Sequence, residues 1–251
     1  MMINNNLKKE ILTKCHELGV KIVGFAPVER WQNSPKKLAN KFNKWIPRDY
    51  WPTSIYPEAQ TVIVIGLPVP LPIIETAPSI YYHELYNTIN NLLDQKAYEI
   101  ATYLTSNGYP SINLPRDAYT NIDELIKNPF AFFSHKHAAY LAGLGSFGQN
   151  NVLLTPQYGP RVRFTSIFTT AKIKPDPLKN IDYCTHCNKC AVNCPVEAIP
   201  SENTSTGNIQ PVDKILCAKH SKKLREKNIA PCGICIKNCP VGDDRETYQR
   251  T

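Results

Sequence analysis

The pattern of apolar and polar residues over the first part of the chain alternates between helical and strand periods. Leu7, Ile11 and Cys15 recur at helical spacing before Gly19, a residue that commonly caps helix C-termini. Cys15 falls on the apolar face, where a free thiol is expected to be a small core residue rather than a ligand. The predicted elements are helices at 4–18, 35–45, 82–106 and 134–142, and strands at 20–27, 61–69, 151–156 and 161–171.

The texture of the sequence changes after Lys172. Before it, strands and helices alternate, which is typical of a sheet covered by helices. The segment "KIKPDPLKN" reads as a proline-punctuated linker, and a cysteine-rich, loop-rich region follows it. We therefore predict an α+β protein with a cofactor-binding sheet domain at residues 1–173 and a second domain at residues 174–251.

Composition, charge and the absence of a signal sequence predict the cellular compartment of the protein. The chain has 251 residues, of which 42% are hydrophobic and 20% are charged, as in soluble globular proteins. The segment "MMINNNLKKE" lacks the apolar core of a secretory signal, and prolines interrupt the apolar run at 61–74. We expect a cytoplasmic protein without membrane attachment, in a compartment where thiols stay reduced. The net charge of +8 is weak evidence for nucleic-acid binding, because anionic metal clusters would offset part of it.

Eight of the nine cysteines lie between Cys184 and Cys239 in two related runs. The first run, "CTHCNKCAVNCP", has the spacing C-x2-C-x2-C-x3-C-P, and the second, "CGICIKNCP", has C-x2-C-x3-C-P. The second run has one cysteine fewer, which Cys217 can supply from upstream. In bacterial ferredoxins with this spacing, the last cysteine of each run binds the cluster of the other run.

Two 4Fe–4S clusters with crossed ligands are therefore expected. Zinc sites and unmetallated core cysteines are the alternatives, but zinc favours two well-separated pairs, and the short gaps leave no need for His186 as a ligand. The predicted ligands are Cys184, Cys187, Cys190 and Cys239 for the first cluster, and Cys194, Cys217, Cys232 and Cys235 for the second.

The segment "GLGSFG" at 143–148 matches a dinucleotide-binding glycine motif, but its surroundings do not. Such a motif requires a strand before it and a helix after it, whereas here a predicted helix precedes a predicted strand. Two interpretations stay open. The glycines bring the backbone close to a ligand, or they form a helix cap and a tight turn.

Several segments together resemble the epoxyqueuosine reductase family. They are "YYHELYNTINNLL", "AAYLAGLGSFGQNNVLLTPQYG", "TSIFTTAKIKPDP", "YCTHCNKCAVNCPVEAI", Cys217 and "PCGICIKNCP", and they extend from Ile80 to Pro240. The family joins a cobalamin-binding domain, related to flavin-reductase and nitroreductase folds, to a ferredoxin-like domain with two clusters. Reductive dehalogenases share this plan. The resemblance implies a short form, since no helical-repeat segment follows Pro240.

The resemblance also implies cofactor-binding residues, position by position. The segment 143–153 matches the part of the family that lies along the corrinoid, and Arg161 and Arg163 stand where the family contacts it with other residue types. The residues 218–220 match a stretch between cluster and corrinoid. The implied cobalamin-binding residues are His83, Gly143, Leu144, Gly145, Gly148, Asn150, Val152, Leu153, Arg163 and His220.

Two departures from the family concern the reaction. The family's catalytic aspartate is absent from "KNPFAFFSHKH", so His135 or His137 is the predicted proton donor, unless both are surface residues of the helix. The family's signature lysine is Gln149 here. These differences argue against epoxyqueuosine in tRNA as the substrate, although the basic segment 219–227 leaves tRNA as an alternative partner.

The leading hypothesis is a reductase in which a soluble low-potential donor feeds electrons through two 4Fe–4S clusters to bound cobalamin, which reduces an unidentified substrate. One alternative is a non-catalytic electron-transfer or corrinoid-reducing protein that serves a partner. Another is a flavin-dependent reductase that keeps the related fold. The absent aspartate favours the electron-transfer alternative, and the glycine loop favours a ligand of some kind.

Overall fold

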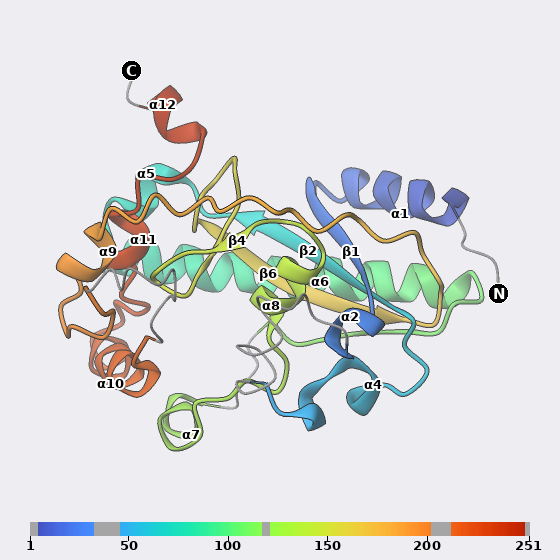
Figure 1. The fold of residues 1–251 in the computed structure, drawn as a ribbon, viewed down its shortest axis with the longest axis horizontal. Helices are drawn as coiled ribbons and strands as arrows, with labels where there is room; N and C mark the ends of the chain where they lie inside the picture. The colour runs from blue at the N-terminus through green and yellow to red at the C-terminus, as the bar shows by residue number, and fades with distance from the viewer. Residues whose placement is uncertain (1–4, 33–45, 117–120, 202–211, 249–251) are drawn as a thin grey trace.

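The computed structural model describes residues 5–32, 46–116, 121–201 and 212–248 (Figure 1). The helix predicted at 35–45 lies outside these residues. The helices are α1 (Asn5–Glu17), α2 (Glu29–Gln32), η1 (Arg48–Tyr50), α4 (Pro52–Ile55), α5 (Leu71–Ile74), α6 (Ile80–Ser106), α7 (Ile122–Lys127), α8 (His135–Leu141), α9 (Lys189–Val192), α10 (Lys214–Arg225), α11 (Ile234–Lys237) and α12 (Asp244–Tyr248). The strands are β1 (Ile22–Pro27), β2 (Thr61–Pro68), β3 (Ser111–Asn113), β4 (Ser146–Phe147), β5 (Leu153–Leu154) and β6 (Val162–Thr169).

An antiparallel sheet with the strand order β1-β2-β6-β3 forms the centre of the fold. In this sheet Ile63 of β2 stands opposite both Phe25 of β1 and Ile167 of β6. The helix α6 packs against β2, β3 and β6, and α8 packs against β1, β2 and β6 (Figure 1). The mixed helix-and-sheet fold predicted from the sequence is therefore confirmed.

The two faces of the sheet bury separate apolar clusters. Ile63 and Ile65 of β2 pack with α1 and α6, whereas Val62 and Val64 pack with α8. Successive side chains of a strand point to opposite faces, so a strand that is covered on both sides is apolar throughout. Cys15 is fully buried in the first cluster, which confirms its prediction as a core residue.

Of the predicted elements that fall in the described residues, all but the strand at 151–156 are confirmed. Ser79 caps α6, because its Oγ accepts a hydrogen bond from the backbone N–H of Tyr82. The strand predicted at 151–156 is reduced to Leu153–Leu154, because the chain turns at Asn150, whose Oδ1 accepts the Val152 N–H at 3.1 Å. The short strands β3 and β4 were not predicted.

The segment after β6 runs back across the sheet and then carries the cysteines. Asp176 anchors it to β1, because its carboxylate accepts hydrogen bonds from the Phe25 N–H at 3.0 Å and from Lys8 Nζ at 2.6 Å. The helices α9, α10 and α11 then gather at one end of the sheet (Figure 1). None of the helices in the described residues is both long and apolar enough to cross a membrane.

Candidate functional site

Four cysteines from both ends of the cysteine-rich region surround one small cavity. The cavity has a volume of about 20 Å³, and Gly148 and Asn150 also line it; its cysteines are Cys184, Cys187, Cys190 and Cys239. Burial and the neighbouring thiols of Cys184 and Cys239 raise the pKa of Cys190 to about 11. The structure thus brings Cys239 to the first cysteine run. We call these four residues the first thiol set.

The other four cysteines form a second thiol set: Cys194, Cys217, Cys232 and Cys235. Burial raises the pKa of Cys235, and the thiols of all three other members raise it too. The thiol of Cys190 acts in the same direction, so the two sets adjoin. Burial also raises the pKa of Cys217, and the thiols of Cys232 and Cys194 raise it further.

Two short helices position the central cysteines of the two runs. Both α9 and α11 begin after a left-handed residue, Asn188 with φ 58° and Gly233 with φ 72°, and the two helices pack against each other. This conformation turns the chain sharply, and glycine and asparagine adopt it most readily. His186 points instead to Asp182, with 3.1 Å between Nε2 and Oδ2. The structure therefore places His186 in an exposed hydrogen-bond contact with Asp182, as a spacer between two cysteines.

The donor sets suit clusters better than single ions. Within the described residues, no three side chains of histidine, cysteine, aspartate or glutamate converge closely enough to hold one metal ion. The four thiols of the first set instead line one shared cavity, and four thiolates are the ligands that an iron–sulfur cluster takes.

Two larger cavities adjoin the second thiol set. The first has a volume of about 390 Å³ and is lined by Cys217 and Cys235. The second has about 370 Å³ and extends along β6 past Arg163. Both are within the size range of sites for small molecules. They share wall residues: Tyr86, Ala131, Ser134, Lys136, Val152 and Pro231.

Lys136 lies in the wall shared by the two cavities, and the sequence pattern did not predict it as a site residue. Its Nζ donates a hydrogen bond to the Asn151 carbonyl oxygen at 2.7 Å. Burial lowers the pKa of Lys136 to about 8, with the Lys214 cation acting in the same direction. The side chain is still mainly charged at neutral pH. A lysine between His135 and His137, at the start of a helix that continues with apolar residues, was the signal in the sequence.

Most predicted residues outside the glycine loop line the cavities. Asn150, Val152 and His83 lie in the wall of the first cavity, and Leu153 and Arg163 in that of the second. The His83 ring contacts the Ala230 carbonyl through Nδ1 and the Asn87 amide through Nε2 at 3.2 Å. It therefore joins α6 to the loop before Cys232. His220, on α10, is not among the lining residues.

The glycine loop packs against the protein's own backbone. Gly143 has φ +72° after the end of α8, and a Cβ there would lie 2.2 Å from the Pro177 carbonyl oxygen. A Cβ on Gly145 would lie 2.0 Å from the Leu154 carbonyl oxygen. Cap geometry and tight packing thus explain these two glycines. Gly143, Leu144 and Gly145 do not line either large cavity.

The two predicted proton donors are placed differently. His135 lines the second cavity, but its Nε2 lies 2.8 Å from the Pro115 carbonyl oxygen and its Nδ1 lies 3.0 Å from Ser166 Oγ. A carbonyl only accepts, so the proton resides on Nε2 and is held there. His137 is buried beside Trp31, away from both cavities, and burial lowers its pKa to about 3. It is not positioned to protonate a ligand.

Comparison with known proteins finds two groups of reductases. The chain is 26% identical to the tetrachloroethene reductive dehalogenase of Desulfitobacterium hafniense over 88% of its own length and 45% of that protein. It is 24% identical to the epoxyqueuosine reductase of Listeria monocytogenes over 93% of its length and 64% of that protein. The chain is similar to both enzyme groups. It spans only about half to two thirds of these relatives. No family model matches it.

Solved structures of both enzyme groups share the fold. The epoxyqueuosine reductase of Streptococcus thermophilus matches with a TM-score of 0.61 and 18% identity, over 94% of this chain and 66% of that one. A reductive dehalogenase matches with a TM-score of 0.65 and 20% identity, over 98% of this chain and 34% of that one. An epoxyqueuosine reductase solved with a tRNA stem loop matches with a TM-score of 0.56 and 20% identity, over 78% and 54%. These matches confirm the resemblance expected from the sequence.

Proposed function

We propose that this protein is an iron–sulfur oxidoreductase that passes electrons through two 4Fe–4S clusters to a bound cobalamin for the reduction of a substrate. Residues 1–173 would form the cobalamin-binding domain, related to flavin reductases and nitroreductases. Residues 174–251 would form the ferredoxin-like domain. Cobalamin would supply a metal centre of low potential at which the substrate is reduced.

One observation carries this proposal: Cys217 and Cys235 of the second thiol set line the same cavity as Asn150 and Val152. A ligand in this cavity would therefore lie next to the second cluster, without an intervening layer of protein. The Cys190 thiol acts electrostatically on Cys235, which supports a short path between the two sets. Electrons would pass from the first set to the second and then to the cavity.

Electrons would enter at the first thiol set. Cys187 is exposed, and the neighbouring Val192 keeps 77% of its surface accessible. A soluble donor of low potential would approach this surface. The chain itself would hold the ligand between α6, α8 and α10, with apolar residues such as Val152 and Phe130 against it.

The deciding experiment is reconstitution of the clusters without oxygen, followed by addition of cobalamin or flavin. We expect protein-dependent changes in the absorption spectrum and in the cobalt EPR signal with cobalamin. A spectral change with flavin alone would favour the flavin-dependent alternative. Cobalamin without any protein-dependent change would overturn the proposal. Reduction of cobalamin only for an added partner protein would favour the electron-transfer alternative.

The iron content of a Cys217→Ala variant tests the clusters separately. Loss of one thiolate from the second set should reduce iron to well below the roughly eight atoms expected for two intact 4Fe–4S clusters. An unchanged iron content would rule out Cys217 as a ligand.

Transfer RNA is a second candidate partner, because α10 presents Lys219, Lys222, Lys223 and Arg225 on one short helix. Lys222 already pairs with Asp123, at 2.6 Å. A gel-shift titration with tRNA at two salt concentrations would test it, since contacts to phosphates weaken steeply with salt.

A further inference from the structure

Apart from the thiols of Cys217 and Cys235, the charged side chains in the walls of the two large cavities are all cations. Lys136, Lys214 and Arg225 line the first cavity, and Arg116, Lys136, Arg161 and Arg163 line the second. No aspartate or glutamate in the described part of the chain lines either cavity. A cleft whose walls carry cationic side chains attracts a ligand of the opposite sign.

Several of these cations already have partners within the protein. Arg161 forms an ion pair with Asp244, and Arg116 forms one with Asp94. Arg163 donates from Nε to the Asn90 side-chain oxygen at 3.1 Å and lies 4.3 Å from the centre of the Tyr86 ring. Arg161 and Arg116 thus have counter-charges within the protein, whereas Arg163 is held by a neutral amide and an aromatic ring.

Lys136 differs from Arg161 and Arg116, because its hydrogen-bond partner is the neutral Asn151 carbonyl. The charged groups of the described chain that act on it are the Lys214 cation and the thiols of Cys217 and Cys235. A lysine ammonium has three N–H groups, and the carbonyl takes one of them. The remaining N–H groups can therefore bind an anionic ligand group, and a hydrogen bond between two charged groups is stronger than one between neutral groups.

The rest of the first cavity is largely apolar. Ile122, Leu125, Phe130 and Val152 contribute to its wall together with Tyr86. Such a wall favours a ligand with an apolar body, and a few polar groups then fix its orientation.

We propose that the joined cavities bind a substrate with an apolar body and one anionic group, and that the ammonium of Lys136 anchors this group. The substrate is that of the reductase, so the inference rests on the proposed function. Because Lys136 lies in the wall of both cavities, it reaches a ligand in either of them.

The experiment compares a carboxylate with its neutral amide on the full chain with reconstituted clusters. The probes are 2-naphthoate and 2-naphthamide, measured by equilibrium dialysis at pH 7. We expect 2-naphthoate to bind at least about tenfold more tightly, as for a hydrogen bond to a charged group. Lys136→Gln should remove most of this preference, and Lys136→Arg should retain it. Lys223→Gln, on the exposed side of α10, is the matched control and should behave as the parent protein.

Each other outcome overturns the proposal. Equal binding of both probes, no binding of either, or a preference that survives in Lys136→Gln would each do so. If Lys136→Gln changes the reduction potential of the cluster but not the preference for 2-naphthoate over 2-naphthamide, Lys136 acts on the cluster and not on the ligand. Iron content and the cluster spectrum confirm that the variant is folded.

Cobalamin is added to the same variants to separate this inference from the proposed function. If Lys136→Gln loses affinity for cobalamin as strongly as for 2-naphthoate, the anion at Lys136 is the corrinoid phosphate and the substrate assignment is wrong. If the parent protein does not respond to cobalamin, the proposed function fails, whether or not Lys136 governs the preference for the carboxylate.

Discussion

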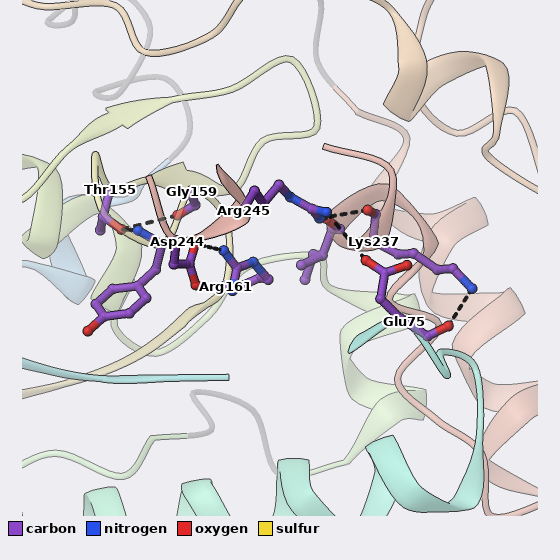
Figure 2. A network of polar contacts seen from close by, with 9 residues as sticks. Glu75, Thr155, Gly159, Arg161, Lys237, Asp244 and Arg245 are labelled. Atoms are coloured by element: carbon purple, nitrogen blue, oxygen red, sulfur yellow. Dashed lines mark hydrogen bonds and ion pairs between the residues drawn. The ribbon is translucent and has the colours of Figure 1, made fainter. Parts of the chain in front are cut away.

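Arg161 and Asp244 form a bidentate ion pair that joins the turn before β6 to the C-terminal helix α12 (Figure 2). The Arg161 side chain has no exposed surface, and Asp244 retains 29% of its own. The adjacent Arg245 binds Glu75 at 3.3 Å and donates to the Lys237 carbonyl at 2.7 Å (Figure 2). These contacts fasten the segment that follows Cys239 to two distant parts of the chain, and so help to fix the position of that thiol.

Removal of the Asp244 charge should therefore destabilise the protein. Asp244→Asn leaves the buried Arg161 guanidinium without its counter-charge, and we expect the free energy of unfolding to fall by about 3 kcal/mol. Urea denaturation followed by circular dichroism measures this change. Glu124→Gln is the control, because it breaks the exposed pair with Lys127 and should cost about 0.5 kcal/mol or less. A loss for Asp244→Asn no larger than that of the control would contradict the assignment.

The crossed grouping of the thiols can be tested with pairs of substitutions. Cys184→Ala with Cys239→Ala removes two members of the first set, and should leave one intact cluster of about four iron atoms. Cys184→Ala with Cys194→Ala removes one member of each set although both residues belong to the same run, and should leave no intact 4Fe–4S cluster. Iron analysis and EPR of the reduced proteins distinguish these results. The reverse pattern would mean that each run binds its own cluster.

The sequence predicted what depends on local pattern. The periodicity of α6, the apolar runs of β2 and β6 and the burial of Cys15 were all visible. The short strands β3 and β4 were not, since two or three residues carry no measurable period. The Arg161–Asp244 pair joins residues far apart in the sequence, and the sequence alone does not indicate which acid pairs with which base.

The residues of the candidate site also fall into those that a local pattern predicts and those that only the packing shows. The cysteine spacing is a local pattern that predicts ligands without any structure. Lys136 was not predicted, because its histidine neighbours are the more usual proton donors. Only the packing of α8 shows which of its side chains face the cavities. His137 faces the core one residue later, since successive residues of a helix lie about 100° apart.

The buried imidazole of His137 should make stability depend on pH. Burial lowers its pKa from 6.5 to about 3, so below pH 6.5 the unfolded chain takes up a proton that the folded protein does not. The contribution of His137 to stability is therefore complete above pH 6.5 and is lost as the pH falls towards 3. From pH 7 to 5.5 we expect a loss of about 1 kcal/mol that is absent in His137→Leu. Urea unfolding at both pH values measures it, with the exposed His16→Gln as control. Equal pH dependence in parent and His137→Leu would disprove it.

The two glycines Gly143 and Gly19 allow a matched test of the linker contact. Both have φ +72°, but a Cβ on Gly19 would meet nothing within 4 Å, whereas one on Gly143 would lie 2.2 Å from the Pro177 carbonyl oxygen. Gly19→Ala should therefore cost only the left-handed backbone, about 1 kcal/mol. Gly143→Ala should cost at least about 2 kcal/mol more, because the backbone of the linker must move. Since this linker leads into Cys184, Gly143→Ala should also lose iron faster when a chelator is added. Equal unfolding midpoints and equal rates of iron loss in the two variants would show that Gly143 is only a helix cap.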